Sequence, residues 1–186
     1  MLDSSRPEAL LNDAISAVED GDGYRAELDK IRAPIYTTDA DGWITCWNQS
    51  CVDFAGREPQ LGEDRWCVTW RLFTLEGDPL PHDKCPMATA INERRSVRSE
   101  IAIAMRPNGS RVAFRPYPTP LFDKSGQLKA AINMLIDISD EQAEVLKEQA
   151  SRCRRLASAT EDPAAREILR SMAAVYDQSA ESLQHN

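Results

Sequence analysis

A strand that is apolar on both faces is the feature that most restricts how this 186-residue chain can fold. Residues 127–139 read QLKAAINMLIDIS, with Ile132, Met134 and Ile136 on one face and Ala131, Asn133 and Leu135 on the other. Successive side chains of a strand point to opposite faces, so both faces of this segment need cover. We therefore expect an α+β fold in which this strand is central.

Other segments alternate in the same way and are separated by turn residues. Residues 34–48, PIYTTDADGWITCWN, predict two strands joined at Asp41-Gly42. Residues 98–106 and 111–122 predict two more strands, the second carrying prolines at 116, 118 and 120. Between these strands, residues 49–75 predict short helical turns, and Pro86 opens a predicted helix that ends near Arg95.

Both ends of the chain show helical periodicity. At the N-terminus a first helix presents its apolar residues on one face, and a second helix covers about residues 24–32. At the C-terminus a helix over 140–159 follows a predicted capping box at Ser139 and Gln142. Asp162 and Pro163 open another helix, so an antiparallel hairpin is expected. The predicted organisation is an N-terminal helical flank (1–27), a central domain that contains the strands (28–139) and a C-terminal helical hairpin (140–186).

The acidic balance of the chain restricts its partners. The net charge is −8, and the excess lies in the flanks: residues 1–32 hold 8 acidic and 4 basic side chains, and residues 140–186 hold 9 and 6. Residues 33–139 are nearly balanced, with 13 and 12, and carry all four Trp. Nucleic acids and anionic membrane surfaces require basic faces, so we expect neither as a partner.

The cysteines and the hydropathy of the sequence favour a cytoplasmic location. The five cysteines are odd in number and form no CxxC pair, which favours reduced thiols in a cytoplasmic protein. No stretch approaches the roughly 20 apolar residues of a membrane span. The N-terminus is acidic, where a signal peptide would be basic.

The order of these elements resembles a PAS domain, over about residues 28–141. PIYTTDADGWITCWNQSC is similar to the family's opening hairpin, including Asn48, and NMLIDISDEQ to its closing strand, with Asp137-Ile138-Ser139 in place of the terminal motif. GEDRWCVTWRLF and EGDPLPHDKCPMATAI resemble the central segment of a bacterial subgroup. The resemblance implies a five-stranded antiparallel sheet with helices over one face and a pocket between them.

Several large side chains are candidates to line that pocket, although residues of this kind also fill cores. They are Trp66, Cys67, Trp70, Phe73, Met105, Phe114 and Met134. Asn48 is expected to bond the helical turn that follows it. Asp137 lies where the last strand becomes a helix, so it either caps that helix or couples the pocket to it.

His82 and Cys85 are candidate ligands of a cofactor, because both residue types bind haem iron or metals. No further donors stand at recognisable spacings, so no metal site is predicted. Cys67 lacks the Asn and Gln neighbours of the flavin-photoreceptor subgroup. No orienting acid accompanies Cys85 and no glycine-rich phosphate loop occurs, so no enzyme is predicted.

These observations favour a non-catalytic, cytoplasmic sensory protein that takes an unidentified small molecule in its core. It is expected to signal through its helical flanks, as a homodimer or by contact with a signalling protein. The alternative is a haem- or flavin-binding redox or gas sensor.

Overall fold

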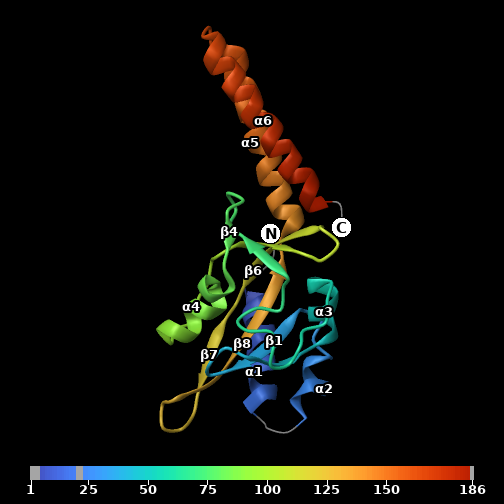
Figure 1. Ribbon diagram of the computed structural model, residues 1–186, viewed down its shortest axis with the longest axis vertical. Coiled ribbons are helices and arrows are strands. Elements are labelled where there is room, and N and C mark those ends of the chain that lie inside the picture. The colour runs from blue at the N-terminus through green and yellow to red at the C-terminus, as the bar shows by residue number, and fades with distance from the viewer. Residues whose placement is uncertain (1–4, 20–22, 185–186) are drawn as a thin grey trace. The chain divides into compact units, whose positions relative to one another are not determined.

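The computed structural model describes residues 5–19 and 23–184, which form two compact units. One unit comprises the chain up to Gly109 together with Phe114–Asp137. The other comprises Ser110–Ala113 and the chain from Ile138 onward. The first unit holds most of an antiparallel sheet and the helices on it, and the second is dominated by a helical hairpin (Figure 1).

The sheet has eight strands, in the order β2-β1-β8-β6-β5-β3-β4, with β7 also paired to β8. The strands are β1 (Ile35–Asp39), β2 (Ile44–Trp47), β3 (Arg71–Phe73), β4 (Pro79–Leu80), β5 (Ala102–Met105), β6 (Arg111–Pro116), β7 (Thr119–Phe122) and β8 (Leu128–Asp137). The strand expected to be central, β8, lies between β1 and β6. The expected α+β fold with an antiparallel sheet is therefore confirmed.

The sheet has more strand segments than the five expected, for two reasons. The predicted strand over 111–122 is divided into β6 and β7, because the prolines at 116 and 118 fix φ and supply no N–H to the ladder. Between them, the Tyr117 N–H donates to the Met134 carbonyl over 2.8 Å. The extra pair β3–β4 closes on a turn in which Gly77 has φ +92°, a conformation that glycine adopts readily.

The residues of β3 were expected to form helical turns, and this expectation was wrong. Of the stretch 49–75, helix α3 covers only Gln49–Ala55, and β3 pairs with β5 through Leu72 and Ala104. The strand is three residues long, too short for a period to appear in the sequence.

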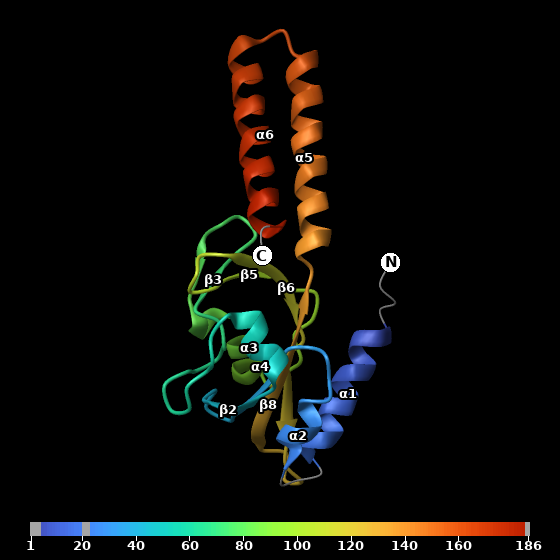
Figure 2. The same cartoon turned by 90° about the vertical axis from the view of Figure 1, so that its right-hand side faces the viewer.

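Helices cover both faces of the sheet (Figure 2). On one face, α1 (Ser5–Glu19) and α2 (Tyr24–Leu28) pack against β1 and β8 in an apolar cluster. The cluster contains Leu11, Ala14, Leu28, Ala33, Ile35, Cys46, Ile132 and Met134. On the other face, Phe54 of α3 meets Phe114 of β6 edge to face, with ring centroids 5.5 Å apart. There α4 (Pro86–Glu93) follows the short turn η1 (His82–Lys84) and buries Met87 and Ile91.

The second unit is the expected hairpin of α5 (Ser139–Ala159) and α6 (Pro163–Gln184). The Asp162 carboxylate caps α6 by accepting from the Ala164 N–H at 2.9 Å. The predicted capping box at Ser139 was wrong: the N-cap is Ile138, and the Ser139 hydroxyl accepts from the Ala113 N–H at 3.1 Å. Within the described residues, no helix is long and apolar enough to cross a membrane.

Candidate functional site

A buried polar cluster on the face of the sheet under α3 is centred on Tyr36. Tyr36 of β1 is fully buried and pairs in register with Asn133 of β8. Its hydroxyl donates to the Trp66 carbonyl at 2.9 Å and accepts from the Asn133 amide at 3.0 Å. The Asn133 side-chain oxygen accepts from the Tyr117 N–H at 2.9 Å. Asn133 thus ties the central strand both to Tyr36 and to the break between β6 and β7.

Two buried thiols adjoin this hydroxyl. The Cys67 sulfur lies 3.1 Å from the Thr69 hydroxyl oxygen. The Cys85 sulfur lies 4.0 Å from the Trp66 carbonyl oxygen, which also accepts from Tyr36. We call Tyr36, Asn133, Cys67, Cys85 and the Trp66 carbonyl the core polar cluster.

Burial keeps the acidic groups of the cluster neutral. Burial raises the pKa of Tyr36 well above its usual range, and raises the pKa of Cys67. It raises the pKa of Cys85 to about 12. In the structure these groups make hydrogen-bond contacts with Trp66, Thr69 and Asn133. Among the residues that the structure describes, no three His, Cys, Asp or Glu side chains gather to hold a metal ion.

Of the predicted pocket residues, Cys67 and Phe114 lie in the interior on the cluster's side of the sheet. Trp66 contributes its carbonyl to the cluster, while its ring packs over the turn between β1 and β2. A Cβ at Gly42 would lie 2.2 Å from ring atom Cε3 of Trp66. The Arg65 guanidinium lies 4.5 Å from the centre of the same ring. The ring therefore packs on the turn of the β1–β2 hairpin.

Met134, which the sequence suggested as a pocket residue, lies on the other face of the sheet. In β8 it is one residue from Asn133, so it points to the opposite face, where it packs in the apolar cluster under α1 and α2. Phe73 and Met105 are half-buried and share one face of the β3–β5 ladder, opposite to Leu72 and Ala104.

Trp70 and Phe73 line a surface groove rather than the core polar cluster. The groove has a volume of about 370 Å³ and also includes His82. Trp70 is 42% exposed, and the Arg71 guanidinium stacks 4.4 Å from its ring centre. These two aromatic residues therefore sit on the outside of the β3–β4 edge.

His82 and Cys85 do not form a joint ligand pair. His82 lies in the surface groove, where partial burial lowers its pKa. Cys85 lies inside, against the Trp66 carbonyl. The H-x-x-C spacing places the two side chains in separate environments.

Asn48 does more than the predicted capping of α3. Its side-chain oxygen accepts from the Cys51 N–H at 3.1 Å, as expected, and also from the Ile35 N–H at 3.0 Å. Its amide group donates to the carbonyls of Leu28, Ile31 and Ala33 over 2.8 to 3.1 Å. Asn48 therefore joins the segment after α2, the start of β1 and the start of α3.

Asp137 is exposed at the end of β8, where it pairs in register with Phe114. One residue, Ile138, separates it from α5. The next two residues each bond to Ala113 of β6. The Ile138 N–H donates to the Ala113 carbonyl at 2.9 Å, and the Ser139 hydroxyl accepts from the Ala113 N–H. The change from strand to helix is thus tied to β6 without any loop.

The residues that sequence reasoning missed are Tyr36 and Asn133. Asn133 could have been noticed as a polar residue in an otherwise apolar run. Nothing in the sequence around Tyr36 indicates that its hydroxyl takes part in a buried hydrogen-bond network. Their contact depends on the register of β1 against β8, which joins residues 97 positions apart.

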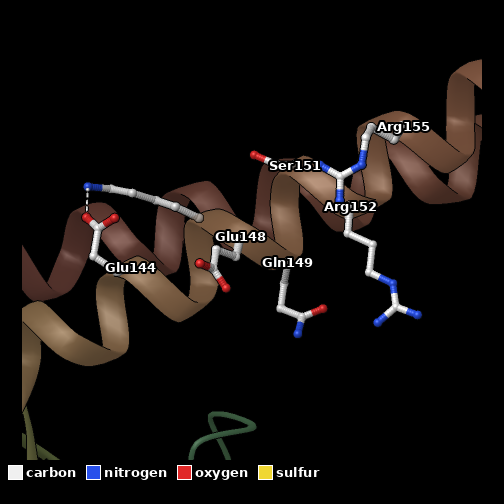
Figure 3. Close-up of a pocket in the computed structure, with 7 residues that line it drawn as sticks. Glu144, Glu148, Gln149, Ser151, Arg152 and Arg155 are labelled. Carbon is white, nitrogen blue, oxygen red and sulfur yellow. Dashed lines mark hydrogen bonds and ion pairs between the residues drawn. The ribbon is translucent and has the colours of Figure 1, made fainter. Parts of the chain in front are cut away.

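A larger hollow lies on α5 alone and carries no site. Figure 3 shows its lining side chains projecting from the helix. Lys147 and Glu144 form an ion pair at 2.9 Å. It has a volume of about 560 Å³ and is lined by Glu144, Lys147, Glu148, Gln149, Ser151, Arg152 and Arg155. A surface built from one helix with charges of both signs is a solvated face.

Comparison with known proteins identifies one family. The family model described as the PAS fold matches residues 28–143. No curated protein matches the sequence.

Solved structures that are similar include the Rhodobacter sphaeroides LOV protein, with 11% identity over 93% of this chain and 97% of that one, and a TM-score of 0.48. The PAS domain of Bordetella pertussis BvgS has 25% identity over 67% and 89%, with a TM-score of 0.44. The PAS domain of the fruit-fly ELK potassium channel has 12% identity over 61% and 92%, with a TM-score of 0.48.

Proposed function

Because the chain belongs to the PAS family, a family of sensory domains that are generally non-enzymatic, we propose that it is a non-catalytic sensory protein. In this proposal a small molecule binds at the core polar cluster. The resulting change passes along β8 into the α5–α6 hairpin, which then alters its contact with another protein surface.

The observation that carries the proposal is the path of β8. Asn133, a member of the cluster, lies four residues before Asp137, and α5 begins two residues after Asp137. β8 pairs with β1 as far as Met134 and with β6 over Leu135–Asp137, and after Ile138 the chain continues as α5. In this proposal a small shift of the strand is carried into the helix along this continuous stretch of chain.

The chemistry of the cluster indicates the kind of molecule it would take. Tyr36, Cys67 and Cys85 are neutral over the physiological range, since burial raises all three pKa values. A charged ligand would find no opposite charge among them and would pay the full cost of desolvation. We therefore propose an uncharged molecule that exchanges hydrogen bonds with Tyr36 and Asn133.

The cysteines support a reducing compartment for this protein. All five are free thiols, and each is buried. Disulfides are rare in the cytoplasm, so free thiols fit the cytoplasmic location that we propose.

Native mass spectrometry of the full chain, purified without denaturation, tests the proposal. The proposal predicts a bound mass that is lost on denaturation and is absent from the Asn133→Leu variant. The matched control Leu61→Ala, at a side chain that is 64% exposed, retains it. Protein that carries no bound mass and gains none from a library of uncharged metabolites would contradict ligand binding. A bound mass equal to that of haem or flavin, with visible absorption, would favour the alternative of a cofactor-binding sensor over a sensor of an uncharged small molecule.

A further inference from the structure

The surface groove along the β3–β4 hairpin is a site separate from the core polar cluster. We call it the β3–β4 groove; residues 70–73 form one of its walls and residues 79–82 the other. Its volume of about 370 Å³ is that of a pocket for a small molecule. No member of the core polar cluster lines it, so a ligand in the groove would be independent of a ligand in the core.

The walls of the groove are fixed before any ligand arrives. β3 pairs with β4 on one side and with β5 on the other. Pro79 and Pro81 restrict φ along the second wall. Because the groove is preformed, a ligand does not have to order it, and less of the binding free energy is lost to conformational entropy.

The walls are mainly apolar and include two aromatic rings. Trp70 is 42% exposed, and Phe73 is half-buried. Leu80 and the two prolines add aliphatic surface. Aromatic rings stack on other planar rings, so such walls favour a flat, aromatic ligand body over a sugar or another strongly hydrated molecule.

Arg71 gives the groove its charge. Among the described residues that line it, Arg71 is the only one with a formal charge, and its guanidinium stacks 4.4 Å from the centre of the Trp70 ring. Over residues 5–19 and 23–184 it forms no ion pair with a carboxylate. The nearby acids Glu76, Asp78 and Asp83 do not line the groove. A stacked guanidinium keeps its N–H donors in the plane of the fork, where they fit the two oxygens of a carboxylate.

His82 adds a polar group to the groove without adding charge. Burial lowers the pKa of His82 below its usual value, so its imidazole is neutral near pH 7. A neutral imidazole has one donor and one acceptor nitrogen. His82 can therefore donate a hydrogen bond to a ligand oxygen, while Arg71 supplies the positive charge.

We infer that the β3–β4 groove binds a free aromatic carboxylate, with its ring against Trp70 and Phe73 and its carboxylate on Arg71. A phosphate ester carries more than one negative charge near pH 7, and one guanidinium would leave part of that charge without a partner. The inference does not rest on the proposed function, because the two ligands differ both in charge and in binding site.

Protein NMR of the full, isotope-labelled chain during titration with cinnamate tests the inference. The indole N–H signal of Trp70, identified by its loss in Trp70→Phe, is expected to shift until the groove is saturated. Cinnamamide has the same ring and no charge, so it should bind at least about tenfold more weakly.

Two substitutions of exposed cations separate the groove from general charge effects. Arg71→Gln weakens cinnamate binding at least about tenfold, to the level of cinnamamide. The matched control Lys84→Gln, in the adjacent turn η1 and outside the groove, changes the Kd by less than about twofold. Circular dichroism verifies that both variants keep the fold.

Three results would overturn the inference. They are an unshifted Trp70 signal, equal affinities for cinnamate and cinnamamide, and equal weakening by Arg71→Gln and Lys84→Gln. Shifts of the Asn133 side-chain amide in place of Trp70 would assign cinnamate to the core and overturn it as well. Arg71→Gln leaves the bound mass of the core ligand in native mass spectrometry unchanged, so failure here and failure of the proposed function are distinguishable.

Discussion

At the scale of single residues, the Asn48 side chain bonds three segments at once: the stretch after α2, the start of β1 and the start of α3. Its side-chain oxygen accepts from two N–H groups, its two amide hydrogens are shared among three carbonyls, and the residue is 1% exposed. Buried backbone groups that lose their partner carry the full cost of desolvation. The contribution of Asn48 therefore exceeds that of an ordinary helix cap.

Replacing Asn48 by Ala is expected to lower the free energy of unfolding by about 2–4 kcal/mol, because it leaves several buried groups without a partner. Urea unfolding followed by fluorescence measures the change. Gln49→Ala, at the neighbouring exposed position, is the control and should shift stability by no more than about 0.5 kcal/mol. A loss below about 1 kcal/mol for Asn48→Ala would show that the network is not cooperative.

The raised pKa values of the cluster predict a loss of stability in alkali. Burial raises the pKa of the folded Cys85 thiol to about 12, from an ordinary thiol pKa of 9.0. Below pH 9 both states are neutral, and the stabilisation is fully present. As pH rises from 9 toward 12 the unfolded state ionises first, so the free energy of unfolding falls, by up to about 1.4 kcal/mol per pH unit for each such group.

Urea unfolding under reducing conditions at a series of pH values measures this slope. Cys85→Ala removes one ionising group, so the fall above pH 9 becomes less steep in that variant, whatever its stability at neutral pH. Identical slopes in the variant and in the natural chain would mean that Cys85 is not shielded from solvent in the folded protein.

At the scale of elements, the β1–β2 turn depends on a contact between backbone and ring. Gly42 and Gly109 have nearly the same φ, +88° and +89°, but only Gly42 faces the Trp66 ring. Both glycines relieve the same backbone strain, so comparing them isolates the contribution of the ring contact.

Gly42→Ala should therefore be more destabilising than Gly109→Ala. The substitution at 109 costs about 1 kcal/mol, for the left-handed backbone alone, and the substitution at 42 costs at least about 1–3 kcal/mol more because the ring must move. Thermal unfolding of both variants measures the difference. Equal losses in the two variants would argue against the packing of Trp66 on the turn.

The elements themselves were largely predictable, since the helices, the opening hairpin and the central strand each leave a period in the sequence. The face of the sheet on which a residue lies was harder to predict from the sequence. Met134 and Asn133 are neighbours of similar burial, and their roles differ only through alternation. Trp66 was predicted to line a pocket because of its size, but its positive φ of 69° turns the ring toward Gly42. That backbone conformation has no sequence marker in a tryptophan.

At the scale of the whole molecule, the chain passes from the first unit into the second where β8 is followed by α5. The chain between Asn133 and Ser139 contains no loop, and Ala113 bonds the backbone of Ile138 and the hydroxyl of Ser139. The proposed sensor requires that a change of hydrogen bonding in the core polar cluster be felt at the start of α5. It does not require that α5 unfold.

Hydrogen–deuterium exchange of the full chain tests this requirement most directly. Tyr36→Phe removes one hydroxyl from the cluster and alters no other group. Leu11→Ala is the control: it opens a cavity under α1, in the apolar cluster on the opposite face, and destabilises the domain by a different route. We predict that Tyr36→Phe changes amide exchange in residues 139–146 of α5 and that Leu11→Ala does not. Changes confined to residues 35–39, 66–69 and 130–135 in the Tyr36→Phe variant would contradict transmission from the core to the hairpin.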